Sequence, residues 1–134
     1  MEKVKFSVIR GNISEIKTLY LGSTSTKGVD ADVADFINKE NLPQTVKFAK
    51  EFAKETGSVI VITSAIDIVA DAETAYCIYN GDPIMSRITG SGCQLSAMMA
   101  AYISANPGNT LQAALACVCA MGLCGEIAKE RMGE

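Results

Sequence analysis

The chain has 134 residues, of which 49% are hydrophobic and 20% charged, and this composition is typical of one folded globular domain. Its net charge of −3 argues against nucleic acid or an anionic membrane surface as a partner. The sequence contains no histidine, which excludes Cys–His and Ser–His catalytic pairs and histidine-ligated zinc sites built from this chain alone.

The five cysteines indicate a reducing compartment. Their odd number, with no signal-peptide core after Met1, favours free thiols over a disulfide framework. Cys117 and Cys119 lack the spacing of zinc ligands. Cys117 and Cys124, seven positions apart, share a helical face, and burial of these cysteines as small residues of an alanine-rich helix is favoured over metal binding. No apolar run is expected to span a bilayer. We therefore expect a cytoplasmic protein without a membrane partner.

In the first half of the chain, β-branched segments alternate with helical ones. In chain order, the pattern predicts a strand at 4–9, a tight turn at 10–12, a helix at 13–22, a polar loop at 22–28, a short helix at 31–38 and a helix from Pro43 to Gly57. Asn12 is expected to cap the helix at 13–22, because Glu15 completes a capping-box pattern. Two sets of apolar residues are spaced for burial: Ile13, Ile16, Leu19 and Tyr20, then Val46, Phe48, Ala49, Phe52 and Ala53.

The second half begins with a continuous β-branched run at 58–63, the pattern of a strand covered on both faces of a parallel sheet. Further along, the pattern predicts a hairpin of strands at 66–69 and 75–79, a turn at 80–83, a helix from the glycine loop to about 105, a break at 106–109 and a helix at 110–129. Small residues crowd the last helix and indicate close approach to neighbouring elements. The order of elements indicates a single α/β domain over 1–134.

The glycine-spaced turn at 89–93 is the most distinctive motif. Gly90 and Gly92 let backbone N–H groups converge, and the following helix N-terminus adds positive partial charge, which predicts an anion site, most often for phosphate. Leu95 stands where a dinucleotide fingerprint has its third glycine, and no Walker A lysine follows. The helix start favours the thiolate of Cys93, so this residue is a candidate base or nucleophile; the alternative is a small helix residue without a catalytic task.

Polar residues near the ends of predicted strands are a second group of candidates. Arg10 suits bidentate pairing with phosphate, or is an exposed surface charge. Glu15 suits magnesium, although capping the helix explains it equally well. Thr63 is a candidate nucleotide contact or an ordinary strand-terminal hydroxyl. The carboxylates of Asp67 and Asp71 lie near turns, and we interpret them as structural.

Together these segments resemble the hydroxyethylthiazole kinases, which are thiamine-salvage enzymes of the ribokinase-like superfamily. The resemblance covers essentially the whole chain, and its segments are 8–16, 28–30, 61–67, 80–83 and 89–93. Cys93 is specific, because related sugar and pyrimidine kinases usually carry aspartate there. The resemblance implies a three-layer α/β/α fold with a mostly parallel sheet, of which this chain is the carboxy-terminal portion.

The activity that the resemblance implies is ATP-dependent phosphorylation of 4-methyl-5-(2-hydroxyethyl)thiazole, with magnesium. It makes Cys93 the catalytic base and Glu15 a magnesium-site carboxylate. Arg10 and Thr63 match ATP-contacting positions. The anion hole for the transferred phosphate consists of backbone from Gly90, Ser91, Gly92 and Cys93, and Gly90 also lies against the thiazole alcohol.

Several departures from the family pattern qualify this expectation. Asp82 stands where the family commonly has histidine, Ser91 where it has threonine, and Ser64-Ala65 where it has Gly-Glu. Family members are about twice as long, so we expect a split or incomplete kinase that a complementing amino-terminal half completes, and a homo-oligomer, since the family forms trimers. The alternatives are a non-catalytic nucleotide-binding or assembly module, and a related kinase for another small alcohol.

Overall fold

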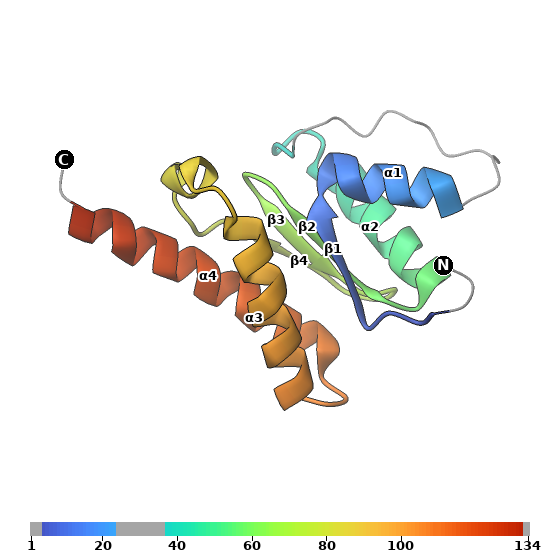
Figure 1. The fold of residues 1–134 in the computed structure, drawn as a ribbon. Coiled ribbons are helices and arrows are strands. Elements are labelled where there is room, and N and C mark those ends of the chain that lie inside the picture. The colour runs from blue at the N-terminus through green and yellow to red at the C-terminus, as the bar shows by residue number, and fades with distance from the viewer. Residues whose placement is uncertain (1–3, 24–36, 133–134) are drawn as a thin grey trace. The chain divides into compact units, whose positions relative to one another are not determined.

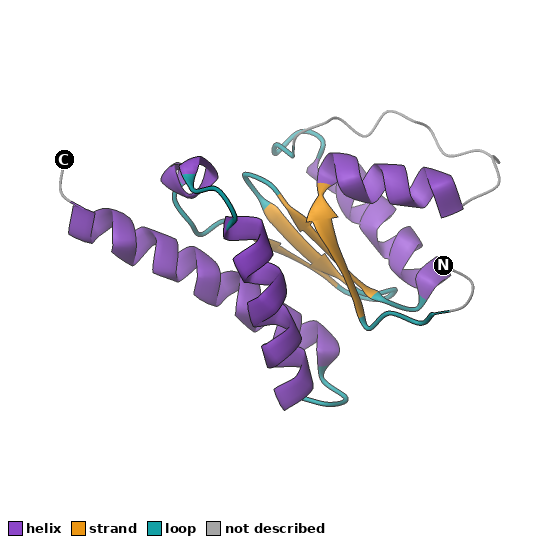
Figure 2. Cartoon of the chain, viewed as in Figure 1, coloured by secondary structure: helices purple, strands orange, loops and turns teal. Residues whose placement is uncertain are grey.

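The computed structural model describes residues 4–23 and 37–132. They belong to two compact units, Met1–Cys77 and Ile78–Glu134, and each unit is described by itself. Figures 1 and 2 show the helices and strands of both units. In chain order the elements are β1 (Val8–Asn12), α1 (Ile13–Ser23), α2 (Leu42–Thr56), β2 (Val59–Thr63), β3 (Asp67–Ala70), β4 (Ala75–Ile78), the 3₁₀ helix η1 (Pro83–Arg87), α3 (Ser91–Ala105) and α4 (Thr110–Met132).

The first unit contains a mixed sheet with the strand order β1-β2-β3-β4. β1 runs parallel to β2, from Val8 opposite Val59 to Asn12 opposite Thr63, so that the carboxyl ends of these strands are level. β3 pairs antiparallel with β2, and a turn with a 2.9 Å bond from Asp71 N–H to the Thr74 carbonyl connects it to β4. The α/β class and the antiparallel interruption are thereby confirmed.

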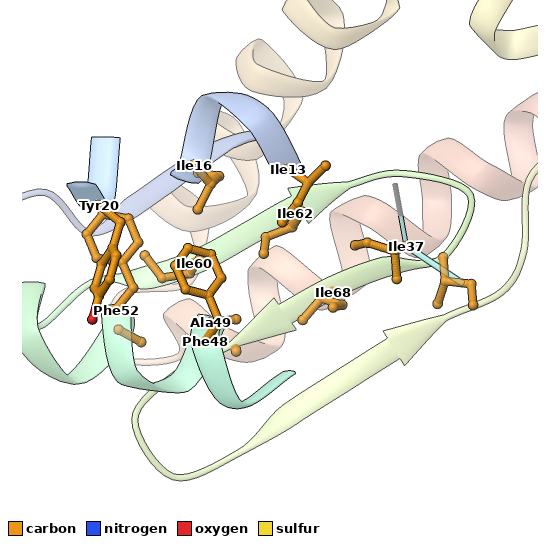
Figure 3. Packing of buried hydrophobic residues seen from close by; sticks show 13 residues of the cluster. Ile13, Ile16, Tyr20, Ile37, Phe48, Ala49, Phe52, Ile60, Ile62 and Ile68 are labelled. Carbon is orange, nitrogen blue, oxygen red and sulfur yellow. The ribbon is translucent and has the colours of Figure 1, made fainter. Parts of the chain in front are cut away.

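α1 and α2 cover one face of this sheet (Figure 1). Strand side chains alternate between faces, so Ile60 and Ile62 of β2 point toward the same two helices. Aromatic rings fill the space between the helices, with Tyr20 edge-on to both Phe48 and Phe52 at centroid distances of 5.1 Å. The buried cluster of Figure 3 consists of Ile13, Ile16, Tyr20, Ile37, Phe48, Ala49, Phe52, Ala53, Ile60, Ile62, Ile66, Ile68 and Ala70.

Local signals set the ends of both helices in the first unit. The Asn12 N–H donates to Glu15 Oε2 and the Glu15 N–H donates to Asn12 Oδ1, each at 2.8 Å, which confirms the predicted capping box of α1. Pro43 lies in the first turn of α2, and Gly57 ends it in the left-handed conformation with φ of 66°. These contacts involve residues close in sequence, which is why the pattern predicted them.

Three expectations for the first unit need correction. The first strand occupies 8–12 and not 4–9, because its pairing with β2 continues through Arg10–Asn12, where a tight turn was predicted. Leu19 lies at the edge of the buried stripe of α1 and is exposed. The predicted loop at 22–28 and helix at 31–38 lie mostly outside the described residues; Ile37 and Asn38, at the end of that helix, are not helical.

The second unit is mainly a pair of helices, α3 and α4, which contact each other. The segment 106–109 separates them, as predicted, and Gly108 there has a φ of 82°. α4 contacts η1 as well, and the small residues of α4 allow this approach. A Cβ on Gly122 would lie 2.6 Å from Asn80 Oδ1, and a Cβ on Gly125 would meet Met85 Sδ. The predicted close approach to the last helix is therefore confirmed at two glycines.

α4 also shows that the expectation of no membrane-length apolar run was wrong. With 23 residues and a mean hydropathy of 1.7 in its most apolar window, it is long and apolar enough to cross a membrane by these criteria. Alanine and cysteine contribute much of this hydropathy beside the leucines of the helix, and the core helix of a soluble protein meets the same criteria. The helix is weak evidence for a membrane span.

Candidate functional site

Arg10 and Thr63 meet at the carboxyl ends of β1 and β2. Arg10 Nη2 donates a hydrogen bond of 3.3 Å to Thr63 Oγ1, and the same hydroxyl donates to the Gly11 carbonyl at 3.4 Å. Parallel pairing brings these residues together, although they are 53 positions apart in the sequence. The two predicted nucleotide contacts therefore lie in one place, at the sheet edge where α/β folds bind ligands.

Glu15, the predicted magnesium carboxylate, is exposed beside this corner. Its Oε2 accepts the Asn12 N–H, which leaves Oε1 for a ligand. Gly11 gives it room, since an added Cβ there would lie 3.0 Å from both Cβ and Oε2 of Glu15. In the parts of the chain described, no group of three or more His, Cys, Asp or Glu residues gathers to hold a metal. One carboxylate with water and phosphate oxygens is nevertheless a common magnesium site, and Glu15 fits that role.

Asp67 belongs to the same corner, which the sequence interpretation missed. It begins β3, and its Oδ1 accepts the Ser64 N–H at 2.8 Å. Burial raises the pKa of Asp67 to about 6, while the Ser64 hydrogen bond and the positive charge of Arg10 act in the opposite direction. The carboxylate is therefore hydrogen-bonded within its own turn and close enough to Arg10 for the positive charge of the guanidinium to lower its pKa. The short connection from β2 to β3 was the available signal, because it places positions 63 and 67 at one edge of the sheet.

The glycine loop of the second unit begins α3. Gly90 has a φ of 89°, in the left-handed region that favours glycine, and the first i to i−4 bond runs from Gln94 N–H to the Gly90 carbonyl at 3.0 Å. Cys93 therefore lies in the first helical turn, as predicted, and Gly92, which the pattern assigned to the glycine loop, lies in that turn as well. Cys93 is exposed. A thiol at the start of a helix, next to first-turn N–H groups, is compatible with the predicted anion site.

Asn80 and Gly81, in the predicted turn at 80–83, hold the chain ahead of this loop against α4, and the pattern did not identify their partners. Asn80 Nδ2 donates to the Cys119 carbonyl at 2.9 Å, and the Gly81 N–H donates to Glu126 Oε1 at 2.8 Å. We call Asn80, Gly81, Cys119, Gly122 and Glu126 the α4 clasp. Only the dense small residues of α4 hinted at this contact. The clasp anchors the start of the segment that leads through η1 to Gly90.

All five cysteines are free thiols, but their surroundings differ. Burial raises the pKa of the thiols of Cys77 and Cys117, which favours their neutral form. Cys117 is fully buried, as expected for a small residue of a core helix. Cys124 is exposed like Cys93, so the expectation of burial was wrong there. Exposure distinguishes Cys93 and Cys124 as the accessible thiols.

Solved structures show which fold this chain shares. A hydroxyethylthiazole kinase from Pyrococcus horikoshii superimposes with a TM-score of 0.73 at 24% identity, over 93% of this chain and 42% of that one. An ADP/ATP-dependent NAD(P)H-hydrate dehydratase from Bacillus subtilis, co-crystallised with ATP and Mg²⁺, gives a TM-score of 0.68 at 18% identity, over 92% and 39%. The chain has part of the ribokinase-like α/β fold.

Sequence comparison identifies the family. Residues 1–134 match the hydroxyethylthiazole kinase family. The chain is 60% identical over 134 residues to a hydroxyethylthiazole kinase of Clostridium acetobutylicum, covering 100% of this chain and 49% of that one. It is 42% identical over 131 residues to one from Clostridium tetani, covering 98% and 47%. The chain belongs to the hydroxyethylthiazole kinase family, and it spans about half the length of these curated relatives.

Proposed function

We propose that the protein containing this chain transfers the γ-phosphoryl group of ATP to the primary alcohol of 4-methyl-5-(2-hydroxyethyl)thiazole. The observation that carries the proposal is family membership over the whole chain, with 60% identity to a hydroxyethylthiazole kinase. In this proposal residues 1–134 act as a single domain that supplies nucleotide- and phosphate-handling groups. Its place is thiamine salvage in the cytoplasm, within a homo-oligomer or with a complementing amino-terminal half.

The proposed nucleotide contacts come from the first unit. The Arg10 guanidinium pairs with ATP phosphate oxygens, because its planar donors match phosphate bidentately. Its hydrogen bond to Thr63 supports a common task for the two residues. Glu15 Oε1 is the proposed magnesium ligand, and magnesium neutralises charge on the phosphate oxygens when it is bound. The fold neighbour co-crystallised with ATP and Mg²⁺ supports this choice of nucleotide and metal.

The second unit supplies the proposed chemistry. The thiolate of Cys93 accepts the proton of the thiazole hydroxyl as that oxygen attacks the γ-phosphorus. One oxygen–phosphorus bond forms, the bond to the β-phosphate oxygen breaks, and ADP leaves. Backbone N–H groups from Gly90 to Cys93 stabilise the charge on the transferring group, with Gly90 against the substrate alcohol. The left-handed Gly90 and the exposed thiol at the start of α3 support these roles.

An assay of thiazole phosphorylation with ATP and magnesium tests the proposal. The 134-residue chain is measured alone and after co-expression with the remaining half of the Clostridium acetobutylicum relative. We expect thiazole phosphate and ADP in equal amounts in the co-expressed sample, and light scattering reports its oligomeric state. No turnover in either sample, with both halves folded, would contradict the proposal. Faster phosphorylation of another small alcohol would show that this alcohol, and not the thiazole, is the substrate.

A non-catalytic nucleotide-binding or assembly module is the second candidate. One observation favours it, namely that Arg10 and Thr63 are hydrogen-bonded to each other at the sheet edge, an arrangement that nucleotide binding can use without a catalytic group. Titration of the chain with ATP and magnesium separates the candidates. Binding without turnover, also after complementation, supports the module, whereas turnover after complementation supports the kinase.

A further inference from the structure

We propose that Asp67 is a positioning residue that orients Arg10 toward the phosphates of ATP. The carboxylate and the Thr63 hydroxyl hold the guanidinium from two neighbouring strands. This inference rests on the proposed function, because the contact between Arg10 and ATP is part of that function. The sequence analysis interpreted Asp67 as a structural residue near a turn, and this inference gives it a second role in nucleotide binding.

Strand register brings the three side chains together. Arg10 comes from β1, Thr63 ends β2, and Asp67 begins the antiparallel β3. Ile62 pairs with Ile68, so the next positions outward along the two strands are 63 and 67, at the edge where Arg10 donates to the Thr63 hydroxyl. The Ser64 N–H donates to Oδ1 of Asp67, and in our proposal Oδ2 is the oxygen that acts on the guanidinium. The arrangement depends on strand pairing and needs no loop outside the described residues.

The charge of Asp67 is not needed for the turn it makes. A neutral amide at this position would still accept the Ser64 N–H through its oxygen. A half-buried carboxylate is costly unless a charge or hydrogen bonds compensate it. Among the described residues, Arg10 is the cation whose charge acts on Asp67. The interaction with Arg10 therefore explains why this position has a charged aspartate and not a neutral amide that would accept the same hydrogen bond.

The consequence for binding is pre-organisation. An exposed arginine loses rotamer freedom when it binds phosphate, and this loss weakens binding. Arg10 already donates a hydrogen bond to Thr63, and in our proposal the negative charge of Asp67 further favours this orientation of the guanidinium. ATP then binds to a guanidinium that is already oriented, so less rotamer entropy is lost on binding. We expect Asp67 to act on ATP through Arg10 and not by its own contact.

A double-mutant cycle on MgATP binding tests this inference by calorimetry on the 134-residue chain. Asp67→Asn keeps the acceptor for Ser64 and removes the charge, and we expect it to weaken MgATP binding about threefold to tenfold. Arg10→Gln is expected to weaken binding more, and the double variant no further than Arg10→Gln alone. Asp71→Asn is the matched control, because Asp71 also accepts backbone N–H groups in a turn of the same unit, at 2.8 and 2.6 Å. It should leave binding unchanged.

The outcomes separate this inference from the proposed function. If Arg10→Gln leaves MgATP binding unchanged, or the wild-type chain binds none, the nucleotide contact and this role of Asp67 are both overturned. If Arg10→Gln weakens binding but Asp67→Asn does not, or the two effects add, only the positioning role is overturned. If Asp67→Asn fails to fold, Asp67→Glu, which keeps but displaces the charge, replaces it in the cycle.

A measurement without nucleotide tests the pairing itself. In the described chain, the Arg10 guanidinium and the Ser64 N–H are the groups that favour the charged form of Asp67. Carbon-13 NMR titration of the Asp67 carboxyl should therefore give a higher pKa in Arg10→Gln than in the wild type. An unchanged pKa would overturn the pairing, whatever the calorimetry shows.

Discussion

The candidate residues of the two units differ in what holds them. In the first unit, Arg10 and Thr63 are side chains that a hydrogen bond connects across parallel strands. In the second, the candidate groups are mainly backbone at the start of α3, and the α4 clasp anchors the segment before it. Substitutions of side chains should therefore alter charge and binding in the first unit. In the second unit, substitutions of glycines should have larger effects, because the glycines set the backbone conformation and the close packing of the segments.

The strongest test of this difference is Cys93→Ala. It removes the proposed base but keeps the backbone N–H groups, so we expect kcat of the complemented kinase to fall about 10²- to 10⁴-fold while MgATP affinity stays within about twofold. The matched control is Cys124→Ala, which removes the other exposed thiol and should retain activity. Steady-state kinetics and calorimetry provide both readouts. Full activity of Cys93→Ala would show that the thiol is not the base.

In the first unit, the next largest effect concerns the charge of Asp67. Its pKa rises from 3.8 to about 6 on folding, so the folded state binds the proton more tightly than the unfolded chain. The stability this contributes is fully present below pH 3.8 and is lost as the pH rises to about 6. Relative to Asp67→Asn, the free energy of unfolding of the wild type should therefore fall over that window, by at most about 3 kcal/mol.

Urea unfolding at several pH values between 3.5 and 7 measures this difference, at roughly half-unit steps. Parallel pH profiles for the wild type and Asp67→Asn would contradict the burial of a titrating carboxyl. A profile in which the wild type gains stability with rising pH would reverse the sign, and would mean that Arg10 outweighs burial.

Gly122→Ala tests the clasp of the second unit. The new Cβ would lie 2.6 Å from Asn80 Oδ1, and Asn80 can move only by giving up its bond to the Cys119 carbonyl. We expect a loss of about 1–3 kcal/mol in the free energy of unfolding, despite the better helix propensity of alanine. Adding Asn80→Ala should recover part of the loss caused by the new Cβ.

The control for the clasp comes from the first unit. Gly22 lies in α1, and an added Cβ there meets nothing within 4 Å. Gly22→Ala should stabilise the protein slightly, by up to about 1 kcal/mol, because only helix propensity changes. Equal effects of the two substitutions in urea unfolding would contradict the clasp.

The smallest effect separates the two roles of Glu15. Glu15→Gln keeps an oxygen for the Asn12 N–H, so its stability should stay within about 0.5 kcal/mol of the wild type, whereas Glu15→Ala should lose about 1 kcal/mol. The two variants should raise the magnesium concentration for half-maximal activity equally, by about tenfold. Unchanged magnesium dependence in Glu15→Gln would leave capping as the task of this residue.

Elements with local causes were predictable from the sequence. Asn12 and Glu15 form their capping box three positions apart, and Pro43 and Gly57 limit α2 through their own backbone preferences. The buried strand β2 needed only its β-branched run. In each case the residues that decide the structure are neighbours in the chain. Leu19 shows where such prediction fails, because helical spacing predicted its burial, whereas its exposure depends on how α1 packs against the rest of the unit.

Contacts between distant residues were not predictable in this way. The strand β1 ends at Asn12 because it pairs with Thr63, and no signal near residues 4–12 contains that partner. The α4 clasp connects positions 39 and 45 apart. For the site, the sequence named Arg10, Thr63 and Cys93, but it interpreted Asp67 as structural. Its proximity to Arg10 follows from the order of three strands.

The sequence by itself determined the family, the α/β class, the capping box of α1 and the residues Arg10, Thr63 and Cys93 as candidates, because local patterns and short motifs are sufficient for each of these. Only the tertiary structure decided that Arg10 and Thr63 share a hydrogen bond, that Asp67 lies at the same edge of the sheet as Thr63 and that Asn80 is held on α4. These contacts depend on strand register and on how closely glycines let segments approach. Both are properties of paired elements and not of any single segment.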